Sequence, residues 1–124
     1  MKTSKDYLDE ANATVPRISA DEAVAAHGQE NSVFIDVRDS AAIAGSGTIA
    51  GAQRIPRGML EFMVDAASPL HNEAMKKEAN VYVMCAVGGQ AALAGKTLQD
   101  MGFKSVTNIG GFADWKDAGG PTES

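Results

Sequence analysis

The sequence predicts an α/β protein built on a parallel sheet, because runs typical of buried strands alternate with helical segments along the chain. Residues 33–37 (Val-Phe-Ile-Asp-Val) and 80–85 (Asn-Val-Tyr-Val-Met-Cys) are mostly apolar and rich in β-branched side chains. Such runs suit strands that are covered on both faces, as in a parallel sheet. The connections between these strands are expected to be right-handed crossovers that contain helices.

Helix and turn signals separate the strands. Ser19 followed by Glu22 forms a capping box and Gly28 supplies a stop, so a helix is expected over about 20–27. Asp39 is expected to cap a second short helix, which ends before a flexible turn at 45–47. The other expected elements are strands at 52–56 and 106–109, helices at 58–64, 71–78, 90–101 and 112–116, and turns at 68–69 and 110–111.

Length and composition fit one globular domain. The chain has 124 residues, of which 44% are hydrophobic and 22% charged. Residues 1–15 are polar and form either an extension or a short helix packed on the outside, and residues 16–122 form the domain. We find no signal-peptide pattern and no run of about 20 apolar residues that could cross a bilayer, so a soluble, cytoplasmic protein is expected.

Charge and residue counts exclude several functional classes. The net charge is −5, which is the wrong sign for nucleic-acid binding. One cysteine cannot form an internal disulfide, and His27 and His71 are too far apart in sequence to suggest a metal site. We therefore expect neither a metal nor another cofactor.

The strongest functional signal is Cys85, at the end of a predicted strand. Ligand sites of open α/β sheets lie beyond the carboxyl ends of the strands. Gly88 and Gly89 allow backbone N–H groups to turn toward a bound anion, and the helix that begins near Gln90 adds its positive end. Both effects favour a thiolate, which is the nucleophilic form of cysteine. The alternative is a structural cysteine that only fills the core.

Several sequence blocks, taken in order, resemble one family. They are Val33-Phe34-Ile35-Asp36-Val37-Arg38, Gly47-Thr48-Ile49-Ala50-Gly51-Ala52 with Ile55-Pro56, the strand and loop around Cys85, and a closing block with Gly102-Phe103, Gly110-Gly111 and Trp115. The chain is similar in these blocks to single-domain rhodanese-like sulfurtransferases, over about residues 17–121. The resemblance implies a three-layer α/β fold with a parallel sheet of about five strands flanked by helices. It also implies that Cys85 accepts a sulfane sulfur as a persulfide and passes it to a nucleophile.

The resemblance also assigns a substrate-binding loop: Ala86, Val87, Gly88, Gly89 and Gln90. Sulfurtransferases of this family have a loop of six residues counted from the cysteine, whereas relatives that act on phosphate or arsenate have a longer loop with an arginine. Here the six run from Cys85 to Gln90 without an arginine, so phosphatase activity is not expected. Many relatives have a basic residue where this chain has Gln90. Its absence favours either a donor that is less charged than thiosulfate or a protein persulfide as the donor.

Three residues outside the loop are candidate supports. Asp36 and Arg38 follow the first buried strand and are expected to form a structural ion pair or loop anchor, with substrate binding as the alternative. Arg57 lies next to Pro56 and supplies the charge that the loop lacks, if the turn faces the site; otherwise it is a surface arginine. The apolar cluster Met59, Leu60, Phe62 and Met63 forms core packing or a rim over the site.

Three functional hypotheses follow. The first is an enzyme that moves sulfane sulfur from thiosulfate or a persulfide to cyanide, a thiol or a protein through Cys85. The second is a non-catalytic persulfide carrier or protein-interaction module of the same fold. The third, a redox-sensing thiol, is weaker because the chain has no second cysteine to resolve an oxidised one.

Overall fold

The computed structural model describes residues 1–124 and contains a four-stranded parallel sheet in the order β3-β1-β4-β5. Its strands are β1 (Ser32–Asp36), β3 (Gln53–Arg54), β4 (Asn80–Cys85) and β5 (Ser105–Gly111). The central pair, β1 and β4, is in parallel register over the full length of β1. The predicted α/β class and parallel sheet are confirmed, with four strands where the resemblance implied about five. At the free edge of β5, where a fifth strand would pair, the chain makes only one isolated parallel bridge, between Arg17 and Asn108.

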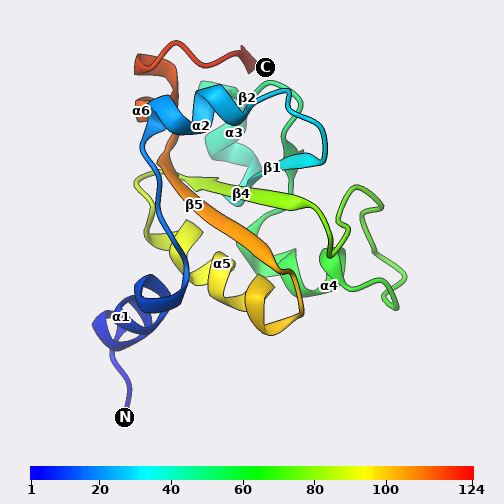
Figure 1. Cartoon of the computed structure of the whole chain (residues 1–124). Helices are drawn as coiled ribbons and strands as arrows, with labels where there is room; N and C mark the ends of the chain where they lie inside the picture. Colours follow the sequence, from blue (N-terminus) through cyan, green and yellow to red (C-terminus); the bar gives the residue numbers. More distant parts are fainter.

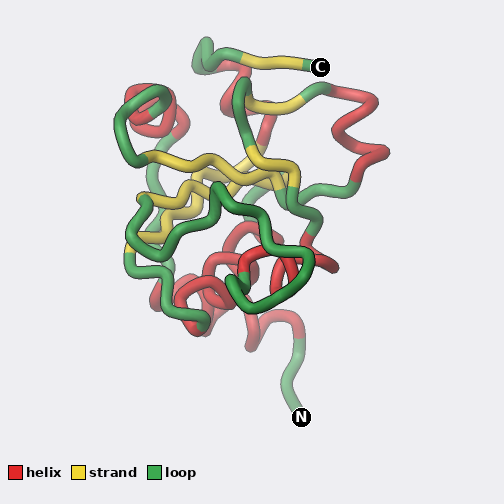
Figure 2. The backbone as a smooth tube through the Cα atoms, turned by 90° about the vertical axis from the view of Figure 1, so that its right-hand side faces the viewer, coloured by secondary structure: helices red, strands yellow, loops and turns green.

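Helices cover both faces of the sheet and make a three-layer molecule (Figures 1 and 2). One layer holds α1 (Ser4–Thr14), α4 (Leu60–Val64) and α5 (Gly89–Asp100), and the other holds α2 (Ala20–Ala26), α3 (Ser40–Ser46) and α6 (Phe112–Asp117). A short antiparallel pair, β2 (Thr48–Ile49) with β6 (Thr122–Glu123), lies apart from the main sheet. None of the helices is long and apolar enough to span a membrane.

The alternation of side chains along β4 builds the two cores. Val81, Val83 and Cys85 belong to the core cluster shared with α4 and α5. Met84 belongs to the second cluster, which contains Trp115 of α6. Successive strand residues point to opposite faces, so a strand covered on both sides must be apolar at nearly every position. This requirement explains why the sequence pattern of β4 predicted a strand so clearly. The same alternation places the Cys85 side chain on the α5 side of the sheet.

Most predicted elements are present, with shifted ends. The capping box of Ser19 and Glu22 opens α2 as expected, and the Asp39 side chain accepts the Ala42 N–H at the start of α3. The turn predicted at 45–47 is wrong in part, because α3 continues to Ser46 and ends at Gly47. The strand predicted at 52–56 is reduced to two residues, and the turn predicted at 110–111 is the end of β5.

The helix predicted at 71–78 is wrong: residues 65–79 form a series of turns. Polar side chains in this segment hydrogen-bond to nearby backbone N–H groups. Asp65 accepts from Ala67, Ser68 from Leu70, and Asn72 from Ala74. Such local bonds offer the backbone an alternative to a helix. The composition of the segment did not indicate that these turns would be more stable than a helix.

Residues 4–14 form a helix that docks on α5. Thr3 and Asp6 make a capping box at its start, and Ala11 and Val15 are buried. The close approach depends on Gly95 of α5, where a Cβ atom would lie 2.9 Å from Cγ1 of Val15. Of the two alternatives for the first 15 residues, the short packed helix is the one present.

Replacing Gly95 with alanine should therefore destabilise the protein, although alanine normally favours a helix. We expect Gly95→Ala to lower the free energy of unfolding by about 1–3 kcal/mol, because the new methyl group overlaps Val15. The matched control is Gly45→Ala in α3, where a Cβ would meet nothing within 4 Å. That change should be neutral or stabilise by about 0.5–1 kcal/mol. Urea unfolding of both variants measures the difference, and equal stabilisation would contradict the close packing of α1.

Candidate active site

The site is built around the sulfur of Cys85, at the carboxyl end of β4. The Sγ atom accepts hydrogen bonds from the backbone N–H of Gly88 at 3.0 Å and from that of Ala91 at 3.3 Å. Gly88 has a φ of 108°, a left-handed conformation that favours glycine, and it caps the start of α5. The sulfur therefore sits at the positive end of a 12-residue helix, with two donors aimed at it. This arrangement stabilises negative charge on sulfur without a neighbouring base.

The loop that follows Cys85 offers a neutral rim. Cys85 itself is 2% exposed, whereas Val87 is 78% exposed, and Ala86 and Gln90 are also exposed. The loop from Cys85 to Gln90 contains no charged side chain. The predicted loop thus brings no charged side chain to the sulfur, and any charge at the site must come from other segments.

Asn108, which the sequence analysis did not single out, holds this loop in place. Its side-chain Nδ2 donates to the Gly88 carbonyl oxygen at 2.9 Å, and its Oδ1 accepts the Gly110 N–H at 2.8 Å. The residue is 1% exposed and its polar atoms are satisfied. A polar amide is unusual inside a buried strand. That oddity in the run Val106-Thr107-Asn108-Ile109 was the signal that could have identified it.

A second support is the contact between the loop and the end of β5. Gly111 pairs with Cys85 across the sheet, and a Cβ atom on Gly111 would overlap the carbonyl oxygen of Ala86. The backbone of the loop thus lies directly against the backbone of β5. Any larger residue at position 111 would push the loop away from its present position.

Asp36 and Arg38 form the expected ion pair, at the carboxyl end of β1. Arg38 Nη2 lies 2.9 Å from Asp36 Oδ2, and the two side chains are 9% and 0% exposed. Thr48 donates to the same carboxylate at 2.7 Å, and Arg38 also donates to Ser46 Oγ and the Gly47 carbonyl oxygen. The pair ties β1 to the start of β2, as expected of a structural anchor.

Arg38 also borders a cavity next to the loop. This cavity has a volume of about 340 Å³ and is lined by Ala86, Arg38, Phe112 and Lys116, among others. The Arg38 guanidinium stacks over the Phe112 ring at 4.7 Å. This cavity is large enough to hold a small molecule beside Ala86 of the loop.

Arg57 is not brought to the loop. Its guanidinium donates to Glu61 at 3.1 Å and to Thr97 Oγ1 at 3.1 Å. Thr97 lies about 12 Å along α5 from its first residue, at a rise of about 1.5 Å per residue. The apolar cluster beside Arg57 divides between core and surface, since Leu60 is buried while Phe62 is 56% exposed.

The carboxyl group of Glu61 has a shifted pKa. Burial opposes its ionisation, but its own backbone N–H and the hydrogen bond and charge of Arg57 together place its pKa below the ordinary value. A lowered pKa means that this interaction stabilises the fold above the ordinary carboxyl pKa and is lost as the pH falls through the lowered one. The effect is small because the Glu61 side chain is 48% exposed.

A second residue that the sequence analysis missed is Arg17. Its Nη2 atom donates to the Val87 carbonyl oxygen at 3.2 Å, across a separation of 70 residues. No local pattern links the two positions, so only the folded chain reveals the contact.

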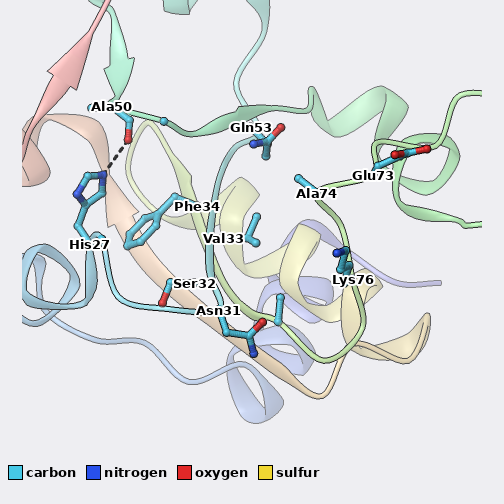
Figure 3. Close-up of a pocket in the computed structure, with 13 residues that line it drawn as sticks. His27, Asn31, Ser32, Val33, Phe34, Ala50, Gln53, Glu73, Ala74 and Lys76 are labelled. Atoms are coloured by element: carbon cyan, nitrogen blue, oxygen red, sulfur yellow. Dashed lines mark hydrogen bonds between the residues drawn. The ribbon is translucent and has the colours of Figure 1, made fainter.

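The largest cavity, shown in Figure 3, is lined by residues outside the Cys85 loop. Its volume is about 540 Å³, and its lining includes His27, Val33, Gln53 and Lys76 but none of residues 85–90. His27 Nε2 donates to the Ala50 carbonyl oxygen at 2.8 Å, so this histidine has a structural role. No group of three potential metal ligands occurs anywhere in the chain.

The chain is similar to known proteins over most of its length. A family model for the rhodanese-like domain matches residues 19–118. A Rhodopseudomonas palustris protein of unknown function, described as a possible tyrosine phosphatase, is 41% identical over 99% of this chain and 96% of its own, with a TM-score of 0.93. The polysulfide-sulfur transferase homodimer of Wolinella succinogenes is 31% identical over 96% of this chain and 85% of its own, with a TM-score of 0.75.

A rhodanese-like domain from an Anabaena protein is 33% identical over 88% of this chain and 79% of its own, with a TM-score of 0.69. No curated protein sequence matches the chain closely. The family match begins after Arg17 and after α1, whereas the Rhodopseudomonas structure covers nearly the whole chain.

The role of Asn108 can be tested by truncation. Asn108→Ala should lower the free energy of unfolding by about 2–3 kcal/mol, because the Gly88 carbonyl and the Gly110 N–H lose their buried partner. The control is Thr107→Ala, a neighbouring half-buried residue whose side chain forms no hydrogen bond; its cost should stay below about 1 kcal/mol. Urea unfolding measures both changes. Equal losses would show that the amide does not support the loop.

Proposed function

Because the chain belongs to the rhodanese-like family, we propose that it is a sulfurtransferase in which Cys85 carries the transferred sulfur as a persulfide. The observation that carries this proposal is the pair of backbone N–H groups, from Gly88 and Ala91, that converge on Sγ at the start of α5. Such charge-assisted hydrogen bonds favour an anionic sulfur over a neutral thiol. A cysteine that only filled the core would not need them.

In the first half of the proposed reaction, the Cys85 thiolate attacks the outer sulfur of a donor such as thiosulfate. A new S–S bond forms, the S–S bond of thiosulfate breaks, and sulfite leaves with the bonding electron pair. The thiolate lone pair becomes the new bond, and the terminal sulfur of the persulfide keeps the negative charge that it carried in the donor. Backbone dipoles are fixed before the reaction, so they can stabilise this anion without reorganising.

In the second half, a nucleophilic acceptor attacks the terminal sulfur. With cyanide, a C–S bond forms, the persulfide bond breaks, and thiocyanate leaves while Cys85 returns to the thiolate. A thiol or a protein cysteine can take the place of cyanide. Taken without neighbouring segments, the neutral loop favours donors that carry less charge than thiosulfate, such as a persulfide. The Wolinella relative is named for polysulfide-sulfur transfer, so a polysulfide is a further candidate donor of sulfane sulfur.

The second candidate is a carrier that presents a persulfide to a protein partner without turning over small molecules. The uncharged rim of Ala86, Val87 and Gln90 favours it, because such a rim contributes little to binding a small anion. Phosphate hydrolysis, suggested by the description of the Rhodopseudomonas relative, is not favoured. The loop has no arginine for a bidentate phosphate contact.

The deciding experiment is thiocyanate formation from thiosulfate and cyanide by the wild type and by Cys85→Ala. We expect turnover in the wild type and none in the variant, because the variant has no atom to hold the sulfur. Mass spectrometry after incubation with donor alone should show the gain of one sulfur atom in the wild type only.

Each other outcome has a distinct meaning. A persulfide on Cys85 without turnover of thiosulfate or a glutathione persulfide donor would favour the carrier. Hydrolysis of p-nitrophenyl phosphate that depends on Cys85, without persulfide formation, would overturn the sulfurtransferase assignment. Cys85→Ser, which keeps a polar atom in place, controls for a change in loop structure.

A further inference from the structure

We propose that Arg17 supplies from outside the loop the positive charge that the loop lacks, and that it binds the anionic end of the sulfur donor. The inference rests on the proposed function and assigns the specificity of that site. Arg17 lies before the range matched by the family model, on the segment that follows α1. It therefore lies outside the residues that the family model matches.

The guanidinium of Arg17 lies against the loop itself. Besides its bond to the Val87 carbonyl oxygen, it covers two glycines with left-handed conformations, Gly88 and Gly110. A Cβ atom on Gly110 would lie 2.8 Å from Arg17 Nη2, and one on Gly88 would overlap Nη1. The charge thus contacts Gly88, the residue whose N–H points at Cys85 Sγ.

The backbone around Arg17 is fixed to the same support as the loop. Asn108 N–H donates to the Pro16 carbonyl oxygen at 2.9 Å, and Ile18 N–H donates to the Asn108 carbonyl oxygen at 3.1 Å. The side chain of Asn108 meanwhile holds Gly88. Asn108 is therefore hydrogen-bonded both to the backbone beside Arg17 and to the loop. These shared bonds hold the arginine and the loop in a fixed relative position.

Arg17 also differs in charge pairing from the other three arginines. Arg38, Arg54 and Arg57 each form an ion pair with a carboxylate, and Arg17 forms none. Three carboxylates line a cavity of about 400 Å³ together with Arg17, and none of them forms an ion pair with it; they are Asp21, Asp114 and Asp117. Arg17 is exposed and most of its N–H donors remain available beside the loop.

An available guanidinium at this point offsets the acidic character of the chain, whose net charge is −5. A local positive charge raises the concentration of an anionic donor at the site and favours its bound state. The ligand class is a small oxyanion that carries a sulfane sulfur, such as thiosulfate or an organic thiosulfonate. The guanidinium would contact the oxygens while Cys85 attacks the outer sulfur.

The test compares donors of different charge. Arg17→Gln should lower kcat/KM about tenfold for thiosulfate, a dianion, and about threefold for methanethiosulfonate, a monoanion, because the lost attraction scales with donor charge. Arg17→Lys should restore most of the loss. Lys104→Gln is the matched control: it removes the same charge from an exposed residue just before β5, at the end of that strand opposite Gly110 and Gly111. It should leave both values unchanged.

A second measurement does not require turnover. The rates at which iodoacetate, an anion, and iodoacetamide, a neutral analogue, alkylate Cys85 give a ratio that reports anion attraction at the site. We expect Arg17→Gln to lower this ratio about threefold or more, and Lys104→Gln to leave it unchanged. Chain mass measures the reaction directly, because Cys85 is the only cysteine.

The two readouts separate the inference from the proposed function. Suppose that the wild type transfers no sulfur but Arg17→Gln still lowers the ratio of alkylation rates. That result would contradict the proposed sulfurtransferase activity and would still support Arg17 as the anion-binding residue. Equal losses for both donors and both reagents would show that Arg17 only holds the loop, and would overturn the inference. A Cys85 that neither reagent modifies would also overturn it, because Arg17 would then not border an open path to the sulfur.

Discussion

The reversal of the chain between β4 and α5 is the constraint on which the site depends. Only a few residues separate the buried strand from the helix, and Gly88 must take a left-handed conformation within them. That turn directs the N–H groups of Gly88 and Ala91 toward the sulfur that ends the strand. Backbone geometry therefore positions and stabilises the reactive atom. No residue in the loop needs to be charged, which is consistent with its exposed, neutral side chains.

Charge enters the site from neighbouring segments instead. Arg38 approaches from the end of β1, but its buried ion pair with Asp36 cancels its charge and makes it an anchor. Arg17 approaches from the edge of β5 with its charge unpaired. This difference follows from the free-energy cost of burying a charge. A buried charge must be paired with an opposite one, whereas an exposed charge can remain available to a ligand. The two arginines thus have different roles although both lie near the loop.

The sequence predicted what depends on local pattern and missed what depends on tertiary contacts. Burial, capping and turn chemistry leave periodic or short-range patterns in a sequence. These patterns predicted the strands around Phe34 and Val83, the capping box at Ser19 and the loop after Cys85. Residues 71–78 were misassigned because side-chain bonds to nearby backbone groups favour turns there. Arg17 could not be predicted, since nothing in the local sequence brings it to Val87, 70 residues away.

The N-terminal segment is connected to the site more closely than an appended extension would be. Val15 belongs to the same core cluster as Cys85 and packs where Gly95 leaves room on α5. Gln99 of α5 donates to the Thr14 carbonyl oxygen, and Pro16 is bound by Asn108. The docked α1 therefore fixes the backbone that carries Arg17, through contacts on both α5 and β5. We therefore expect the docking of α1 to influence the position of Arg17 beside the Cys85 loop.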